Sequence, residues 1–595
     1  MSKKKTGAEK IRWGLNELFS GLDDPKIEAV FITAREKADS FSKKYKGKIV
    51  DLAPLELKAA LEKKAGLLAP IYQLSQYVSL NYAINSTDEK VKALVDKIDT
   101  FESEIANKIL FFALELGALP LDIYKKFENA PELKDYAYPI YMAKKTAKYH
   151  LSEKEEKVVN LKNLSGTIAL KKLYQELTTS FEFEFEVEAE LKRMNGSELR
   201  AMRYHQDPKI RRRAMKIFFD KYAEHELTIT HLFNAILKDH NTEREMRKYI
   251  SPISIMNVHN DLKNNIVETL HLVTNESYHL VHRYYQLKAK ILGLRDMTLA
   301  DIYAPMPESK SKYTWDESKK IVLKGFQDFD DEFYTLAKLM FTKKRIDAPV
   351  LKNKRGGAFC SSSTPDLDPY VMLNFLGQER DVATMAHELG HAIHSMLSKG
   401  QNLYNFHSIL PLAETASVFG EMLITDLLLK KEKDKNNKIA ILTSKLEDIF
   451  ATSHRQNMFS TFEQAAHKLV EERRASAKEL NEIYFQGLKK MFGNSIKYTD
   501  EYKWEWASIP HMFEVPFYVY AYNFGNLLVM ALYEMYQEEG KSFIPKFKKM
   551  LAAGSSASPK DITAITGADI SNPDFWRKSL KYIEGKIDEL EGLLT

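Results

Sequence analysis

The stretch HELGHAIH at residues 387–394 decides how the rest of this sequence is interpreted. His387 and His391 stand four residues apart, so on an α-helix their imidazoles share one face, with Cβ atoms about 6 Å apart. That spacing lets both rings reach one Zn²⁺ at roughly 2.0–2.1 Å, while Glu388 points beside the metal and can take a proton from a water bound there. The HExxH pattern alone occurs by chance roughly 0.03 times in a chain of this length, so its context has to support a metallohydrolase.

The residues around the two histidines predict a helix from about Val382 to Lys399, with Asp381 as its N-cap and Gly400 at its end. Its other positions are largely apolar, which indicates a helix packed into a core. Two histidines and a glutamate are costly to bury in such a helix unless a ligand uses them. This context favours a metal site over a solvated, salt-bridged helix face.

A catalytic zinc usually has three protein ligands and leaves one position for water. The metzincin pattern requires glycine and histidine where this chain has His394 and Leu397, so that class is excluded. A helix beginning near Pro411 supplies a glutamate instead. We predict Glu414 as the third ligand, with Glu421 as the alternative ligand or as a residue that hydrogen-bonds to one. His394 is predicted to orient a neighbouring carboxylate, the alternative being a core histidine bonded to a backbone carbonyl.

The composition fits a large globular protein. The 595 residues are 44% hydrophobic, which allows a large core divided among two or three regions. Lysine and arginine (87) nearly balance aspartate and glutamate (82), so nothing indicates a nucleic-acid partner. The single cysteine, Cys360, excludes an intramolecular disulfide, and no apolar stretch resembles a secretory signal or a membrane span. We expect a soluble, cytoplasmic protein with no membrane partner; its oligomeric state is not indicated.

Most of the chain has the periodicity of helices, so the predicted fold class is mainly α. Residues 51–70 are expected to form a helix that begins and ends at proline-bearing turns. Alternation of apolar and acidic residues at 181–188 predicts a half-buried strand or an extended segment, with an amphipathic helix as the alternative. Residues 351–370 are rich in glycine, serine and proline and predict a long loop, followed by a short strand at 370–375.

Taken together, the motifs resemble those of the thimet-type oligopeptidase family of zinc metallopeptidases, most closely its bacterial oligoendopeptidase F branch. The octet matches the HExGHxxH signature of that family, and the ETAS segment carries Glu414, with Glu421 closing it. The other similar segments are WGLNELFSG at 13–21, KRGGAFCSS at 354–362, YVMLNFLG at 370–377, WASIPHMFEVPFYVYAYNFGN at 506–526 and NPDFWRKSLKYIEGKIDELE at 572–591.

This resemblance implies a prolate, helical, two-lobed metallopeptidase with a deep central channel and a small β-sheet next to the HExxH helix. It implies an N-terminal helical region at 1–110, an oligopeptidase F-type helical domain at 111–195, and a zinc metallopeptidase catalytic domain at 196–595. It also implies one Zn²⁺ per chain. The expected substrates are short, unfolded peptides, because a channel excludes folded proteins.

The resemblance also implies which residues contact the substrate. In the family a short strand pairs with the peptide backbone, which would place Gly357 and Ala358 near the substrate. His511 matches a histidine that contacts the substrate and the tetrahedral intermediate. Tyr518 and Tyr522 are the best matches for the tyrosines that act with it, although a glycine stands at a third tyrosine place. The alternative for both tyrosines is an aromatic core stripe.

The sequence therefore predicts a zinc-dependent endopeptidase that hydrolyses internal bonds of short oligopeptides. Glu388 would accept a proton from the metal-bound water, and Tyr522 or His511 would donate a hydrogen bond to the oxyanion. One alternative is a zinc exopeptidase, either a carboxypeptidase or a dipeptidase, but no motif that captures a chain terminus is identifiable. The other is a non-catalytic helical peptide-binding scaffold. Structural zinc sites favour four ligands and cysteine, and Cys360 is far from the octet in sequence.

Overall fold

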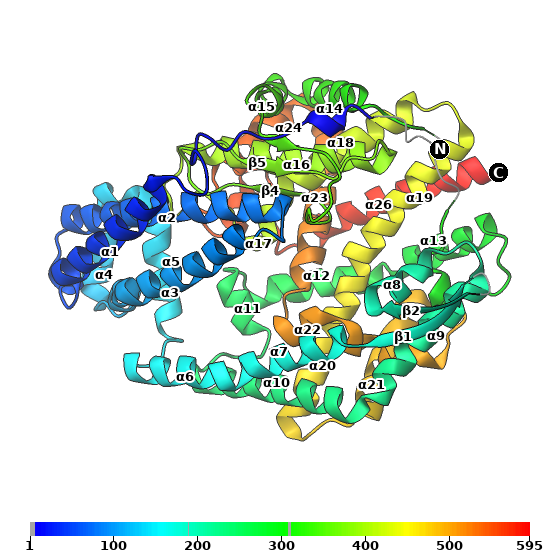
Figure 1. The fold of residues 1–595 in the computed structure, drawn as a ribbon, viewed down its shortest axis with the longest axis horizontal. Helices are drawn as coiled ribbons and strands as arrows, with labels where there is room; N and C mark the ends of the chain where they lie inside the picture. Colours follow the sequence, from blue (N-terminus) through cyan, green and yellow to red (C-terminus); the bar gives the residue numbers. More distant parts are fainter. Residues whose placement is uncertain (1–5, 188–189, 307–310) are drawn as a thin grey trace. The chain divides into compact units, whose positions relative to one another are not determined.

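The computed structural model describes residues 6–187, 190–306 and 311–595, and these are mainly helical, as predicted (Figure 1). The chain divides into two compact units, each made of three separate stretches. Unit 1 comprises Met1–Lys148, Ser311–Lys431 and Met535–Asp569, and unit 2 comprises Tyr149–Lys310, Glu432–Glu534 and Ile570–Thr595. No helix among the described residues is both long and apolar enough to cross a membrane. The implied channel and the three implied domains stay predictions.

The N-terminal part of unit 1 is a helical bundle. Helices α1 (Pro25–Tyr45), α2 (Pro54–Ile84) and α3 (Glu89–Gly117) pack on one another around a shared apolar core, in which the rings of Phe31 and Phe101 meet edge to face at 4.8 Å. The other helices of unit 1 outside the sheet region are α4 (Leu121–Glu128), α5 (Ala137–Ala147), α14 (Trp315–Phe329), α15 (Asp331–Thr342), α24 (Phe543–Ala552) and α25 (Pro559–Ala564).

The prediction that the second helix ends at Pro70 is wrong, because α2 continues through this proline to Ile84. Proline has no amide hydrogen, so the carbonyl of Gly66, four residues earlier, loses its helical donor. Lys37 of α1 supplies a substitute, with Nζ 3.2 Å from the Gly66 oxygen. A lysine from another helix thus donates to the carbonyl group that the proline leaves without a helical donor.

A small three-stranded sheet in unit 1 lies against the helix that carries the octet. Its strands are β3 (Ile346–Asp347), β5 (Tyr370–Met372) and β4 (Phe359–Ser361), in that order, with β3 parallel and β4 antiparallel to β5. Strand β5 confirms the short strand predicted from 370. The fully buried Lys354 donates to Asp347 Oδ1 and Leu373 O, each at 2.7 Å, and so fastens the loop before β4 to the sheet.

The octet lies on α16 (Glu379–Leu397), which begins three residues before its predicted start. Asp381 is therefore not the N-cap. Asp381 instead lies in the first turn of α16, and its carboxylate accepts hydrogen bonds from the backbone amides of Leu376 and Gln378 at 2.8 and 2.9 Å. This reach back to the chain before the helix is a capping-box interaction, in which Gln378 is the N-cap.

Helix α16 packs along α18 (Thr415–Lys431), and two glycines set how closely the two helices approach. A Cβ on Gly390 would lie 2.4 Å from the carbonyl oxygen of Ala416 and 2.5 Å from the Cα of Ser417. In return, a Cβ on Gly420 of α18 would lie 3.2 Å from the carbonyl oxygen of Ala386. At Gly390 the nearest atoms are all backbone, so no flexible side chain is available to yield, whereas at Gly420 the ring of Phe326 is as close as the backbone.

The described residues of unit 2 are also mainly helical, and they include one antiparallel pair of strands. Strands β1 (Glu182–Val187) and β2 (Glu190–Asn195) pair antiparallel, which confirms the predicted strand, and Phe183 and Phe185 of β1 are buried. Its helices are α6 (Glu153–Ser165), α7 (Thr167–Thr179), α8 (Gly196–Ala201), α9 (Pro208–Glu224), α10 (Glu226–Met246), α11 (Ser254–His259), α12 (Asn264–Glu276), α13 (Tyr278–Ile291), α19 (Lys435–Thr452), α20 (His454–Glu472), α21 (Ala477–Phe492), α22 (Pro510–Glu514), most of α23 (Tyr520–Glu539), and α26 (Pro573–Leu594).

The core of unit 2 contains a neutral histidine. His454 is fully buried, and its two ring nitrogens face the hydroxyls of Ser277 and Ser453 at 2.9 and 2.8 Å. Burial lowers the pKa of His454 from 6.5 to about 3, because the charged imidazolium would lose its water.

We predict that Gly390→Ala lowers the free energy of unfolding by about 1–3 kcal/mol, because the new methyl group can be accommodated only if α16 and α18 move apart. The matched control is Gly66→Ala, at a helical glycine where a Cβ would meet nothing within 4 Å. That control should gain about 0.5–1 kcal/mol from the helix propensity of alanine. Urea denaturation followed by circular dichroism measures both. Equal stability of the two variants would contradict this account of the packing.

We predict that acid destabilises the fold partly through His454. The folded-state pKa lies below that of the unfolded chain, so the unfolded chain binds the proton more readily. The stability contributed by neutral His454 is therefore complete above about pH 6.5 and is lost as the pH falls toward 3, by about 1.4 kcal/mol per pH unit. Denaturation midpoints between pH 7 and 5 should fall less steeply for His454→Gln than for the wild type. Identical slopes would show that His454 is not the group responsible.

Candidate metal centre

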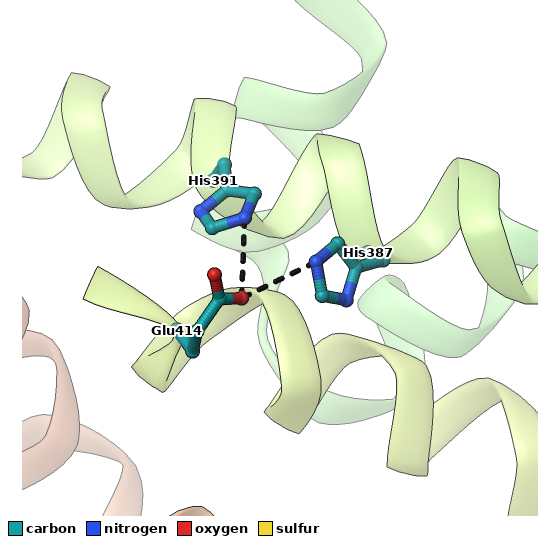
Figure 2. Close-up of side chains that lie close together, drawn as sticks. All are labelled: His387, His391 and Glu414. Atoms are coloured by element: carbon teal, nitrogen blue, oxygen red, sulfur yellow. Dashed lines mark ion pairs between the residues drawn. The ribbon is translucent and has the colours of Figure 1, made fainter. Parts of the chain in front are cut away.

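Three predicted ligands come together in unit 1. His387 and His391 project from the same face of α16, and the Glu414 carboxylate points toward them (Figure 2). One ligand atom from each residue lies within 4.8 Å of the others. The Nε2 atoms of both histidines are each 3.3 Å from the same carboxylate oxygen, Glu414 Oε2. Two imidazoles and one carboxylate form a donor set typical of catalytic zinc sites.

Glu414 lies between two helices and not inside a single one. The short helix α17 (Leu410–Ala413) ends just before it, and α18 begins just after it. Ser417 donates to the backbone oxygen of Glu414 at 3.0 Å and to its Oε2 at 2.7 Å, which orients the carboxylate. His394 hydrogen-bonds to the backbone of Ala413, the residue before Glu414. His394 therefore contacts the backbone beside the predicted ligand Glu414.

Glu421 contacts the other side of the first histidine. Its Oε2 lies 3.3 Å from Nδ1 of His387, whereas Nε2 of the same ring faces Glu414. Glu421 does not belong to the group of three converging ligand atoms. A carboxylate on Nδ1 fixes the ring orientation and the tautomer that leaves Nε2 for a metal.

The charges of this cluster favour a cation at its centre. Burial alone would lower the pKa of His387, but the carboxylates of Glu414 and Glu421 raise it to about 10. Burial likewise would raise the pKa of Glu414, but hydrogen bonds from His387 and His391 outweigh it and hold the pKa far below its usual range. Two carboxylates around two imidazoles therefore stabilise positive charge between them, and a divalent ion fits that requirement.

Glu388 is a buried acid beside this cluster. Its side chain is only 6% exposed, and its Oε2 has no hydrogen-bond partner among the described residues. Burial raises the pKa of Glu388, and the nearby His387 and His391 partly oppose that shift. A carboxylate whose pKa is raised accepts a proton more readily near neutral pH, as a general base must.

These residues border a cavity of about 390 Å³ in unit 1. Its wall also includes Ala358 and Cys360 from the region of β4, and Phe406 and His407 from the loop before α17. No spacing pattern in the sequence connects Cys360, Phe406 or His407 to the octet, so these residues are found only in the structure. Nε2 of His407 lies 3.4 Å from the carbonyl oxygen of Ser363.

The glycine loop leads directly into β4. Gly357 has a φ of 78°, which favours glycine, and its carbonyl accepts a hydrogen bond from Asn374 Nδ2 at 2.8 Å. Ala358 lines the cavity, whereas Gly357 is not part of its wall. Within the described chain, β4 pairs along one edge only, with β5.

The remaining predicted residues lie together in unit 2. His511 on α22 and Tyr522 in the first turn of α23 approach with Nε2 and Oη 3.4 Å apart. The ring centroid of Tyr518 lies 5.9 Å from that of His511 and 5.3 Å from that of Tyr522. All three are at least partly exposed, whereas the neighbouring Phe517 and Tyr520 are buried. Phe517 and Tyr520 therefore belong to the core, whereas the predicted residues on either side of them in the sequence do not.

Comparisons with known proteins identify the family of this chain. The model of Peptidase family M3 matches residues 201–582, and that of Oligopeptidase F matches residues 115–183. The chain is 27% identical to Oligopeptidase PepF of Bacillus subtilis, covering 98% of this chain and 87% of that protein. It is 26% identical to an Oligoendopeptidase F homolog of Borreliella burgdorferi, covering 98% of each.

The fold is similar to a crystal structure of oligoendopeptidase-F from Enterococcus faecium. The TM-score is 0.73 at 21% identity, covering 96% of this chain and 99% of the other. This similarity supports the helical fold, and the family match extends over well more than half of the sequence, including the octet and Glu414. The chain therefore belongs to Peptidase family M3.

Proposed function

We propose that this peptidase is a zinc-dependent endopeptidase that hydrolyses internal bonds of short, unfolded oligopeptides. The observation that carries the proposal is the convergence of His387, His391 and Glu414 beside the buried Glu388 on one cavity. The names of its relatives, oligopeptidase and oligoendopeptidase F, support short peptides and internal bonds. The single cysteine supports a reducing compartment, and we place the enzyme in the cytoplasm.

His387, His391 and Glu414 would hold one Zn²⁺. When bound, zinc supplies a Lewis acid that lowers the pKa of water toward 7 and polarises a carbonyl group. Glu421 keeps the His387 ring oriented through Nδ1, and Ser417 keeps the Glu414 carboxylate oriented through Oε2. These contacts hold the ligand atoms in position before any ion arrives, which favours affinity.

Glu388 acts as the general base and then as the general acid. Its carboxylate accepts the proton of the attacking water and returns it to the amine that leaves when the peptide bond breaks. Burial supports both steps, because the raised pKa of Glu388 brings it closer to the pH at which the enzyme works. The unpartnered Oε2 leaves the carboxyl available for this exchange.

An extended peptide would pair with the edge of β4 that no described strand occupies. Main-chain hydrogen bonds hold a peptide whatever its side chains are, which suits an enzyme acting on many oligopeptides. Ala358 borders the cavity just before this strand, and Gly357 next to it lets the backbone turn with a positive φ. Both residues would therefore lie beside the bound peptide.

The group of His511, Tyr518 and Tyr522 would contact the peptide and donate hydrogen bonds to the developing oxyanion. The imidazole and the phenol of Tyr522 already approach within 3.4 Å, so both can be directed at one acceptor. Each donor of this kind typically contributes about 10²–10³-fold in rate.

We predict that Glu388→Gln binds zinc as the wild type does but lowers kcat by about 10²–10⁴-fold, because the amide cannot accept the proton. Metal content by atomic emission and turnover of a fluorogenic peptide measure the two effects separately. Glu379→Gln, the same substitution in the first turn of α16, is the matched control and should keep nearly full activity. Full turnover by Glu388→Gln would refute its assigned role.

We predict that a peptide library of graded length, analysed by mass spectrometry, yields internal fragments of the shorter members only. A chelator should abolish cleavage, and Zn²⁺ should restore it. Release of single residues or dipeptides from a terminus would instead indicate an exopeptidase. Cleavage that is indifferent to the chelator would contradict metal dependence.

A further inference from the structure

Phe517 has an unusual backbone in the segment that carries His511, Tyr518 and Tyr522. It follows Pro516 in the short link between α22 and α23, its side chain is fully buried, and its φ is 61°. Bulky residues seldom adopt this left-handed conformation, and where they do the surrounding structure must enforce it.

A buried acid contacts this residue. Glu463 of α20 is 2% exposed, and its Oε1 accepts the backbone amide of Phe517 at 2.9 Å. Its Oε2 has no hydrogen-bond partner, and no ion pair joins Glu463 to a cation among the described residues. Burial raises the pKa of Glu463 to about 8, so at neutral pH the carboxyl is protonated and uncharged. An uncharged carboxyl accepts the amide without placing a charge in the core.

The side chain of Phe517 packs against two histidine rings, one buried and one partly buried. The centroids of His467, on the next turn of α20, and of His240 lie 4.6 and 5.7 Å from that of Phe517. Burial lowers the pKa of both histidines, which therefore pack as neutral rings. This packing fixes the aromatic ring, whereas the Glu463 hydrogen bond fixes the peptide plane.

The two helices that flank the link are attached by other residues. Lys171 of α7 donates to the backbone oxygen of Glu514 at 2.7 Å, at the end of α22. Asn260 donates to the Tyr520 hydroxyl at 2.9 Å, at the start of α23. Neither contact restrains the amide of Phe517. The amide of Tyr518, the next residue, donates to the Val515 oxygen at 3.2 Å and closes the turn around Pro516 and Phe517. Within that turn, the Glu463 contact is the bond that holds the Phe517 amide.

We propose that Glu463 is a positioning residue, which holds the Phe517 backbone in its left-handed conformation and thereby sets the arrangement of His511, Tyr518 and Tyr522. The inference rests on the proposed function, in which those three side chains contact the reacting peptide. Without the carboxyl, the Pro516–Phe517 peptide turns, φ of Phe517 relaxes toward negative values, and Tyr518 and Tyr522 separate from His511. Small misplacements of groups that act in the transition state lower rates strongly.

The test compares Glu463→Gln with Glu463→Met. The glutamine side-chain oxygen can still accept the Phe517 amide and is uncharged, like the protonated acid, so kcat should stay within about threefold of the wild type. Methionine has a similar length but offers no comparable acceptor, so kcat should fall by about 10²-fold while zinc content is unchanged. Glu463→Asp, whose carboxyl is one methylene too short to reach, should behave like Glu463→Met and serves if the latter does not fold.

A double-mutant cycle separates positioning from general destabilisation. If Glu463 acts through Tyr522, then Glu463→Met should cost little further kcat in a Tyr522→Phe background. Leu488→Ala, in the core of α21, is a control that lowers stability in unit 2 and should leave kcat unchanged. Additive losses, or an equal loss in Glu463→Gln, would overturn the proposal.

Failure of the proposed function gives a different result. If His511→Phe and Tyr522→Phe both retain wild-type kcat, these side chains do not act in the reaction, and the oxyanion role is wrong. If they lower kcat but Glu463→Met does not, only the positioning role of Glu463 is wrong.

Discussion

The close contact between α16 and α18 at Gly390 is the constraint on which the candidate site depends. A side chain there would collide with the backbone at Ala416 and Ser417, two and three residues after Glu414, in the segment that directs its carboxylate. The distance between the helices therefore sets whether Glu414 can meet two imidazoles one turn apart on α16. The glycine inside HELGH is thus as much a part of the site as the residues that carry its chemistry.

The same contact determines the electrostatics. Because α18 lies so close, both Glu414 and Glu421 reach His387, one on each ring nitrogen. The cluster is partly buried, and the close contacts of His387 with the two carboxylates outweigh the tendency of burial to keep the imidazole neutral. A site with this excess of negative charge favours a divalent ion, whose charge complements two carboxylates better than a proton does.

Sequence patterns predicted the features that depend on residues close together in the chain. The spacing of His387 and His391 follows from helix periodicity, and the strand at 182–187 follows from alternation. The predicted start of α16 is wrong because an aspartate can stabilise a helix start either as the N-cap or from the third helical residue, as Asp381 does. Which position it takes depends on the preceding chain, whose amides it accepts. The continuation of α2 through Pro70 and the approach of His407 and Cys360 to the cavity depend on partners distant in sequence, which no spacing rule identifies.

Two buried glutamates show how neighbours determine the chemistry of one side chain. Burial raises the pKa of both Glu388 and Glu463, yet only Glu388 has imidazoles close enough to oppose the shift. Glu388 lies at a cavity where a proton can arrive and leave, so its ionisation is usable. Glu463 is buried, and its one hydrogen bond comes from a backbone amide, so an uncharged acceptor is the stable form there. A raised pKa alone therefore does not identify a catalytic acid; access to the reacting group does.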